Sequence, residues 1–136
     1  MAGGLTFAAA LFLGANDRLA RRSALRRVRG LLLNREPIPD EQFQAALSDF
    51  DHELVQVVRE SVAMFFGVPE EMIHPGDNLY SDYRLSVLDP EFHIFVIRRA
   101  VHAKNIQPGW VRFDTSTLSS YPAFLRQINT IISSDD

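Results

Sequence analysis

Apolar residues recur with the period of an α-helix along most of this chain. The clearest stripe, between residues 49 and 66, consists of Leu54, Val58, Val62 and Phe65, with Val55 and Phe66 alongside. A spacing of three or four residues places these side chains on one face of a helix. Gly67 follows, at the position where a left-handed residue commonly ends a helix. The pattern therefore predicts a helix over residues 49–66.

Two more periodic segments follow in the second half of the chain. The first stripe combines Phe92, Val96 and Ala100 with Ile97 and Val101, and the second contains Phe124, Leu125, Ile128, Ile131 and Ile132. Asp89, Pro90 and Glu91 match an N-cap, a proline at the first helical position and an acid in the first turn. We predict helices over residues 89–104 and 120–132. A short helix over residues 41–47, capped by Asp40, is also expected.

The first 36 residues form a separate N-terminal extension. An apolar start leads into an arginine-rich helix whose stripe is Ala20, Ala24, Val28, Leu31 and Leu32. Gly14 and Asn16-Asp17 lie between the two halves and are expected to break or cap the helix. The linker E-P-I-P-D, residues 36–40, contains two prolines that disfavour helix. The body is then residues 37–136.

No segment of strand length alternates apolar and polar residues, so the sequence predicts an all-α fold. The loop of about twenty residues before Asp89 is longer than compact domains usually tolerate without anchors. We expect it to pack onto the bundle as a crossover through Met72, Ile73, Leu79, Tyr80 and Leu85. Residues 106–118 hold too many helix breakers for a long helix, and one short turn is expected around residues 110–113.

The phrase F-F-G-V-P-E-E-M-I-H-P-G-D-N-L, residues 65–79, resembles the end of the first helix and the following loop of the acyl carrier protein family. Thr117-Leu118 is similar to the start of the last helix of that family. The resemblance covers residues 49–132. It implies a small helical bundle, here with an N-terminal helical extension. It also implies acyl transport on a phosphopantetheine group that is attached to a serine.

The serine motif of that family, D-L-G-x-D-S-L, is only partly present. Without gaps, Asp82 matches the opening aspartate and Leu88 the final leucine. Arg84 then replaces the glycine, Ser86 the second aspartate, and Val87 the serine itself. In this register the attachment site is lost.

Two other registers are open. A shift of one residue brings Ser86 onto the serine, whereas alignment on the helix start makes Asp89 the capping aspartate and puts Pro90 at the serine position. A carrier serine lies at a helix N-terminus, where the dipole suits a phosphate. We favour a carrier-like domain that has lost its serine and acts by protein contacts. Phosphopantetheine on Ser86 is the alternative, and a loop serine that bonds nearby backbone is the plain interpretation.

Acidic residues gather around the loop and the start of the second long helix: Glu70, Glu71, Asp77, Asp82, Asp89 and Glu91. The resemblance implies that such acids dock onto basic patches of partner proteins. The plain alternative is a solvated loop with helix-capping acids. The body as a whole, with seven basic and fifteen acidic residues, also suits basic partner surfaces.

The N-terminal extension has the opposite charge, with seven arginines against two acids. Six of them form a candidate site for anionic surfaces: Arg18, Arg21, Arg22, Arg26, Arg27 and Arg29. Acidic lipid or nucleic acid would provide such a surface. Aromatic residues are not interleaved with the arginines, which disfavours nucleic acid. The apolar residues 2–13 resemble an interfacial element and are too few to span a bilayer. They also favour homodimerisation.

The remaining chemistry is sparse and favours a protein that is not an enzyme. None of the four histidines is four residues from another, so no helical zinc pair is present, and all four are expected at the surface. Ser86, Asp89 and His93 have the residue types of a hydrolase triad, but no nucleophile elbow surrounds the serine. The absence of cysteine excludes disulfides and is compatible with a cytoplasmic location.

Overall fold

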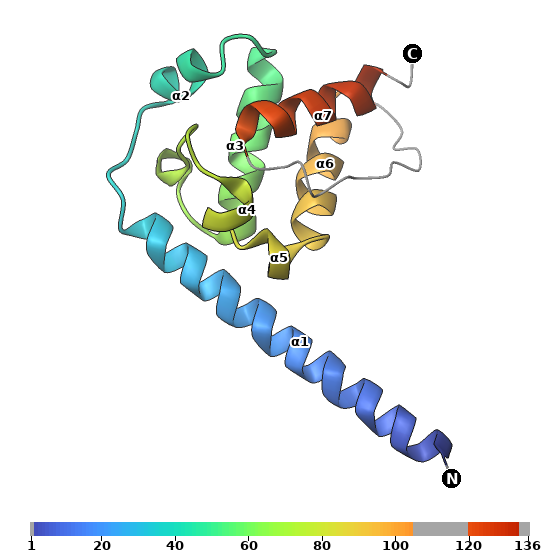
Figure 1. The fold of residues 1–136 in the computed structure, drawn as a ribbon. Helices are drawn as coiled ribbons and strands as arrows, with labels where there is room; N and C mark the ends of the chain where they lie inside the picture. The colour runs from blue at the N-terminus through green and yellow to red at the C-terminus, as the bar shows by residue number, and fades with distance from the viewer. Residues whose placement is uncertain (1, 105–119, 134–136) are drawn as a thin grey trace.

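The computed structural model describes the backbone of residues 2–104 and 120–133, and the side chains of residues 18–104 and 120–132 (Figure 1). Every regular element within these ranges is helical, and they contain no strand. The predicted all-α fold is therefore confirmed. Residues 105–119 lie outside the described part of the chain, including the turn that the sequence predicts around residues 110–113.

The elements follow one another as α1 Ala2–Leu33, α2 Asp40–Ala46, α3 His52–Phe66, the 3-10 turn η1 Glu70–Met72, α4 Leu79–Asp82, α5 Leu85–Leu88, α6 Glu91–Ala103 and α7 Tyr121–Ser133. Helices α3, α6 and α7 match the three long helices that the apolar stripes predict, within three residues at each end. The long loop is not structureless, because η1, α4 and α5 divide it into three single turns.

Both ends of α3 are fixed by local chemistry. The Asp51 carboxylate accepts a hydrogen bond from the Leu54 amide at 3.1 Å, which caps the helix and sets its start after residue 51. Gly67 ends the helix in the left-handed conformation, with φ of 69°, and its N–H bonds the carbonyls of Ala63 and Met64. The predicted role of Gly67 is confirmed.

The predicted cap of α6 is wrong. Pro90 is the N-cap residue, α6 begins at Glu91, and no side-chain hydrogen bond caps it. The Asp89 carboxylate instead lies 2.5 Å from Nδ1 of His93, one turn along the helix. Asp40 is likewise not a cap: it is the first residue of α2, and its carboxylate faces the buried Arg59 guanidinium at 3.4 Å. In both cases the carboxylate lies against a side chain, the Arg59 guanidinium or the His93 ring, and does not cap the helix backbone.

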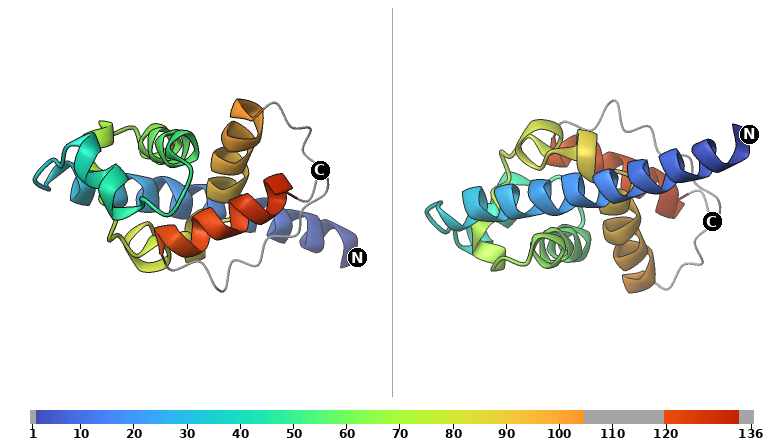
Figure 2. Two further views of the ribbon diagram at one scale, coloured as in Figure 1. Left: turned by 90° about the horizontal axis from the view of Figure 1, so that it is seen from above. Right: turned by 90° about the horizontal axis from the view of Figure 1, so that it is seen from below.

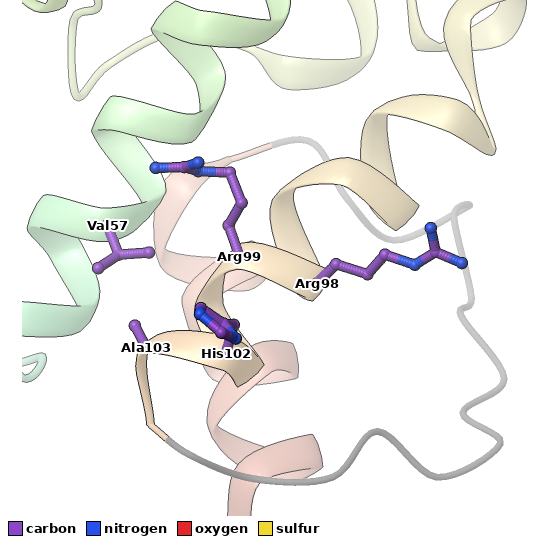
Figure 3. A pocket seen from close by; sticks show the side chains of 5 residues that line it. All are labelled: Val57, Arg98, Arg99, His102 and Ala103. Atoms are coloured by element: carbon purple, nitrogen blue, oxygen red, sulfur yellow. The ribbon is translucent and has the colours of Figure 1, made fainter.

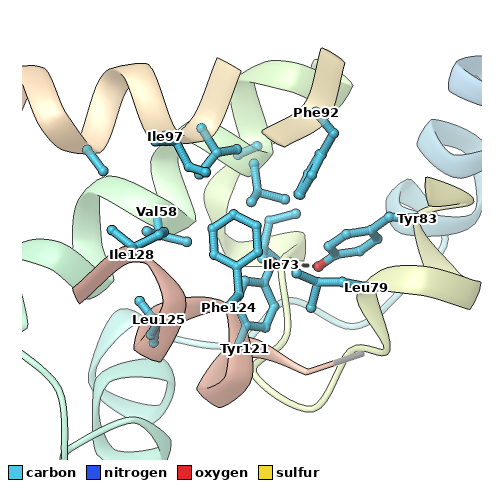
Figure 4. Packing of buried hydrophobic residues seen from close by; sticks show 14 of the residues in the cluster. Val58, Ile73, Leu79, Tyr83, Phe92, Ile97, Tyr121, Phe124, Leu125 and Ile128 are labelled. Atoms are coloured by element: carbon cyan, nitrogen blue, oxygen red, sulfur yellow. Dashed lines mark hydrogen bonds between the residues drawn. The ribbon is translucent and has the colours of Figure 1, made fainter. Parts of the chain in front are cut away.

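The core lies between α3, α6 and α7, and the long loop closes it (Figure 4). Phe92 of α6 meets Phe124 of α7 edge to face, with ring centroids 5.9 Å apart. Five loop side chains were expected to anchor the crossover. Ile73, Leu79 and Leu85 are buried and Met72 is half-buried, but Tyr80 is 49% exposed.

Tyr83, which the apolar pattern did not select, fills the place expected for Tyr80. Its ring is fully buried and lies 5.1 Å from that of Phe66. The exchange follows from α4, because residues 79 and 83 lie one helical turn apart and so share a face, whereas residue 80 is turned away by about 100°. Counting from Leu79 with a helical rather than an extended period would have found it.

Helix α1 crosses the underside of the body, where it packs against α5 and α3, and its N-terminal half projects beyond the other helices (Figure 2). It is continuous through Gly14 and residues 16–17, so the expected break is wrong. None of the helices in the described ranges combines the length and the apolar character needed to cross a bilayer.

The contact face of α1 is narrower than predicted. Ala24, Val28 and Leu32 are buried, but Ala20 is exposed and Leu31 is 59% exposed. The three buried residues follow a strict four-residue spacing, whereas Leu31 lies about 100° around the helix from Leu32. Because α1 contacts the body along one narrow face, only the side chains on that face are buried.

Candidate functional site

A polar cluster of the half-buried Arg35 and the buried Asp77, Tyr83 and Tyr121 fixes the long loop. Arg35 Nη1 lies 2.7 Å from Oδ1 of Asp77, and the Tyr83 hydroxyl donates to Oδ2 of the same carboxylate at 2.6 Å. The hydroxyls of Tyr83 and Tyr121 lie 2.7 Å apart. These four side chains connect the end of α1, the loop and α7. We call them the polar clamp.

Burial sets the protonation states in the polar clamp. It raises the pKa of the Tyr83 and Tyr121 phenols well above the ordinary value, so both stay neutral. Burial alone would lower the pKa of the Arg35 guanidinium, but the hydrogen bond and the charge of Asp77 outweigh it and the pKa is raised. The cluster thus holds one tight ion pair and two neutral phenols, an arrangement suited to holding structure together.

A second buried cation, Arg59, holds the linker against the same loop. Its Nη2 donates to the carbonyls of Ile38 and Ile73, at 3.1 and 3.2 Å, and its guanidinium carbon lies 4.4 Å from the centre of the Phe43 ring. Hydrogen bonds and a ring face replace the water that a buried guanidinium loses. Arg59 is therefore a structural residue as well.

The segment that resembles the serine motif folds into α4 and α5. Ser86 is exposed and is the second residue of α5. A hollow of about 410 Å³ adjoins it, lined by Tyr80, Leu85, Ser86, Asp89 and Pro90. Helix α5 is a single turn of four residues, so few aligned peptide dipoles point at the hydroxyl. The site offers an accessible serine but little of the electrostatic setting that a phosphate prefers.

Arg84 has an unusual backbone conformation. With φ of 52° and ψ of 48° it is left-handed, and it is the only non-glycine residue with a positive φ in the described ranges. In the sequence, Arg84 stands out only because it replaces the glycine of the serine motif. That replacement was the available signal, because glycine commonly marks a left-handed position. Three residues further on, Val87 is half-buried and packs against the core.

The three residue types of a triad do not assemble into one. His93 is fully buried, so the expectation of a surface position is wrong, and its ring stacks on Phe124 with centroids 5.4 Å apart. Position 93 lies next to Phe92 on the inner face of α6, where the Asp89 carboxylate supplies its polar partner. Ser86, by contrast, is an exposed residue. A nucleophile in water and an imidazole in the core cannot exchange a proton directly.

Three of the six predicted docking acids are occupied within the fold. Asp77 is only 6% exposed and belongs to the polar clamp, so its predicted docking role is wrong. Asp89 pairs with His93, and Glu91 with Arg21 at 2.8 Å. These carboxylates hold secondary structure elements together.

The other three acids lie nearer to solvent. Glu70 is half-buried and accepts a hydrogen bond from Gln56 at 3.2 Å. Glu71 and Asp82 are exposed, and Asp82 also accepts from the Asn78 amide at 2.8 Å. Of the predicted docking set, Glu71 and Asp82 therefore retain the accessibility that a partner contact requires.

The six arginines of the predicted anionic-surface site divide in the same way. Arg21 pairs with Glu91, and Arg29 Nε donates to the Phe66 carbonyl at 2.8 Å. The others are exposed on α1: Arg18, Arg22, Arg26 and Arg27. The described part of the chain contains no group of three or more histidine or acidic residues placed to hold a metal ion. No protein-family model, curated protein or solved structure matches this chain.

Proposed function

We propose that this protein is a carrier-like helical module that acts through protein contacts and carries no prosthetic group. The supporting observation is the left-handed backbone of Arg84. In the ungapped alignment with the acyl carrier pattern, Arg84 takes the place of a glycine, the residue that adopts this conformation at least cost. A left-handed residue at the position of the pattern's glycine favours this register over the other two.

In that register Val87 stands where a carrier has its serine, and valine has no hydroxyl to modify. Val87 is also half-buried against the core. Under the proposal, the packing of α5 has taken over a position that a carrier keeps open to its transferase. Contacts with other proteins are then the remaining function of the fold.

The docking surface we propose includes Glu71 and Asp82, which lie on the loop that carries the resemblance. Both are exposed, and the acidic body adds a long-range field that attracts a basic partner surface. Rim charges of this kind mainly affect the rate of association and its salt dependence.

The proposal is tested by partner capture with charge-neutral variants. The double variant Glu71→Gln/Asp82→Asn keeps the oxygen that accepts from the Asn78 amide, so the loop should stay folded. The matched control is Glu41→Gln/Asp49→Asn, because both residues are exposed acids elsewhere on the body. We expect a partner that the wild type and the control retain and the loop variant loses. A partner retained equally by all three proteins contradicts the proposed surface.

A second candidate function is that of a working carrier with phosphopantetheine on Ser86. The exposed hydroxyl and the adjoining hollow support it. The one-turn helix and the left-handed Arg84 count against it. A mass measurement separates this candidate from the first one.

A third candidate is an adaptor for anionic surfaces. Arg22, Arg26 and Arg27 are exposed on α1, and the described residues offer them no recorded partner. Binding to acidic vesicles should then weaken steeply with salt, and should be lost in the triple arginine-to-glutamine variant. Binding that this triple change leaves intact would exclude the adaptor function.

A further inference from the structure

A groove follows the outer face of α6 where this helix meets α3. Two hollows, of about 410 and 490 Å³, share Arg98 and Arg99 as lining residues. The first is completed by Val57, His102 and Ala103, and the second by Phe65, Glu91, Ile94 and Phe95. The groove is therefore cationic toward the end of α6 and apolar toward its start. Neither hollow includes Ser86 or the acids of the proposed docking surface.

The cationic part is partly preorganised. Arg99 extends toward α3, whereas Arg98 extends away from it (Figure 3). Arg99 Nε donates to the Ser61 hydroxyl at 2.9 Å, and that hydroxyl donates to the Val57 carbonyl at 2.6 Å. A guanidinium has five N–H donors, so the terminal nitrogens of Arg99 remain for a ligand. His102 lies beside this hollow and is exposed.

The two guanidiniums have no compensating acid within the described part of the chain. No carboxylate there lies within ion-pair distance of Arg98 or Arg99. Glu91 lines the apolar hollow, but it pairs with Arg21. An anion bound against Arg99 would supply the charge partner that the described residues do not.

The apolar part presents side chains that water solvates poorly. Ile94 is 40% exposed, and Phe65 and Phe95 are half-buried with their ring centroids 5.7 Å apart. Both hollows are open to solvent, and together they place charged groups at one end and apolar side chains at the other. A ligand that fits this groove must combine an anionic group with an apolar part.

We infer that the α3–α6 groove binds a small, soluble, amphiphilic anion. Its carboxylate or phosphate lies against Arg99 and His102, and its apolar part covers Phe65, Ile94 and Phe95. Guanidinium groups bind both kinds of oxyanion well. This inference does not rest on the proposed function, since it uses another face of α6.

Calorimetric titration of the full chain with octyl phosphate tests the inference, with inorganic phosphate and octanol as the two halves of that ligand. We expect octyl phosphate to bind at least about tenfold more tightly than either half, because both ends of the groove contribute. Equal binding of inorganic phosphate, or no binding of octyl phosphate, overturns the inference. Binding to phosphatidylglycerol vesicles but not to soluble octyl phosphate overturns it as well, because the source is then a membrane.

Variants identify the site. Arg99→Gln should weaken octyl phosphate binding about tenfold, the value of one charge-assisted hydrogen bond. The matched control Arg126→Gln removes the same charge from an exposed part of α7 and should change binding less than about twofold. Arg98→Gln and Ile94→Asn alter exposed side chains and should fold normally, which the melting temperature checks. Folded Arg99→Gln and Ile94→Asn proteins that bind like the wild type contradict the proposed site.

Discussion

At the residue scale, the backbone of Arg84 carries a conformational cost. A non-glycine residue in the left-handed region loses about 1–2 kcal/mol relative to the right-handed one, because its Cβ approaches the following carbonyl oxygen. Gly67 occupies the same region without that cost. The sequence thus keeps a glycine at one left-handed position and has an arginine at the other, and the second position underlies the proposed register.

Exchanging Arg84 for glycine and for alanine measures this cost. Arg84→Gly removes the strain, whereas Arg84→Ala removes the side chain and keeps the strain. We expect the glycine variant to be more stable than the alanine variant by about 1 kcal/mol in denaturant unfolding. The usual order, with alanine more stable than glycine, would show that residue 84 is not left-handed in solution and would remove the support for the register.

Individual buried positions were only partly predictable from the sequence. Phe92, Val96 and Ala100 follow the helical period and are buried as expected. His93 and Tyr83 are also buried, although a search for stripes of apolar residues does not select them because they carry polar atoms. Each has a polar partner that an apolar period does not reveal. The Tyr83 hydroxyl lies against that of Tyr121, far along the chain, and the His93 ring lies against the Asp89 carboxylate, one turn away. Periodicity detects apolar faces and does not detect satisfied polar groups.

At the scale of elements, long helices were predictable and single turns were not. Helices α3, α6 and α7 each bury a stripe over at least three turns, which gives a strong periodic signal. A single turn such as α4 or α5 has only four residues, too few for a helical period of apolar residues to be recognised. The start of α6 was misplaced because Asp89-Pro90 has a cap-like sequence, while the Asp89 carboxylate bonds the His93 ring instead of the backbone.

Two substitutions separate the cap of α3 from its ion pair. The Asp51 carboxylate accepts from the Leu54 amide, and Lys104 Nζ lies 2.7 Å from the same carboxylate. Asp51→Asn keeps a capping oxygen and loses the charge, whereas Asp51→Ala loses both. We expect Asp51→Ala to cost about 1 kcal/mol and Asp51→Asn only a small part of that, because exposed ion pairs contribute little. Similar losses in both variants would assign the effect to the ion pair.

The pH dependence at this helix end has a definite sign. The hydrogen bond from Lys104 lowers the pKa of the Asp51 carboxyl, so its contribution to stability is present above the unfolded-state pKa and is lost as the pH falls through the folded-state pKa. Asp51→Asn should reduce the acid-side loss of stability. An unchanged acid limb of the stability profile would contradict this assignment.

At the scale of the whole molecule, the polar clamp joins segments that are far apart in the sequence. Arg35 follows α1, Tyr121 begins α7, and Asp77 and Tyr83 belong to the loop between them. No local pattern predicts such a cluster, because each member resembles an ordinary surface residue until the fold brings them together. The clamp explains why so long a loop can be part of a compact body.

Alkaline pH should unfold the protein through the clamp. Burial raises the pKa of Tyr83 and Tyr121, so their contribution to stability is complete below the unfolded-state value of about 10 and is lost as the pH rises above it. We expect the tyrosinate absorbance of Tyr83 and Tyr121 to appear together with the loss of helical circular dichroism. In the variant Tyr83→Phe/Tyr121→Phe, the loss of stability between neutral and alkaline pH should be smaller than in the wild type. Full ionisation of all three tyrosines in a folded protein would contradict the buried clamp.

The most direct test of the proposed function is the intact mass of the protein after incubation with coenzyme A and a broad-specificity phosphopantetheinyl transferase. A working acyl carrier protein in the same reaction serves as the positive control, and Ser86→Ala as the site control. We predict no change in the mass of the wild-type chain, because the proposed register places Val87 at the serine position. A gain equal to one phosphopantetheine group, abolished by Ser86→Ala, would contradict it and identify the protein as a carrier.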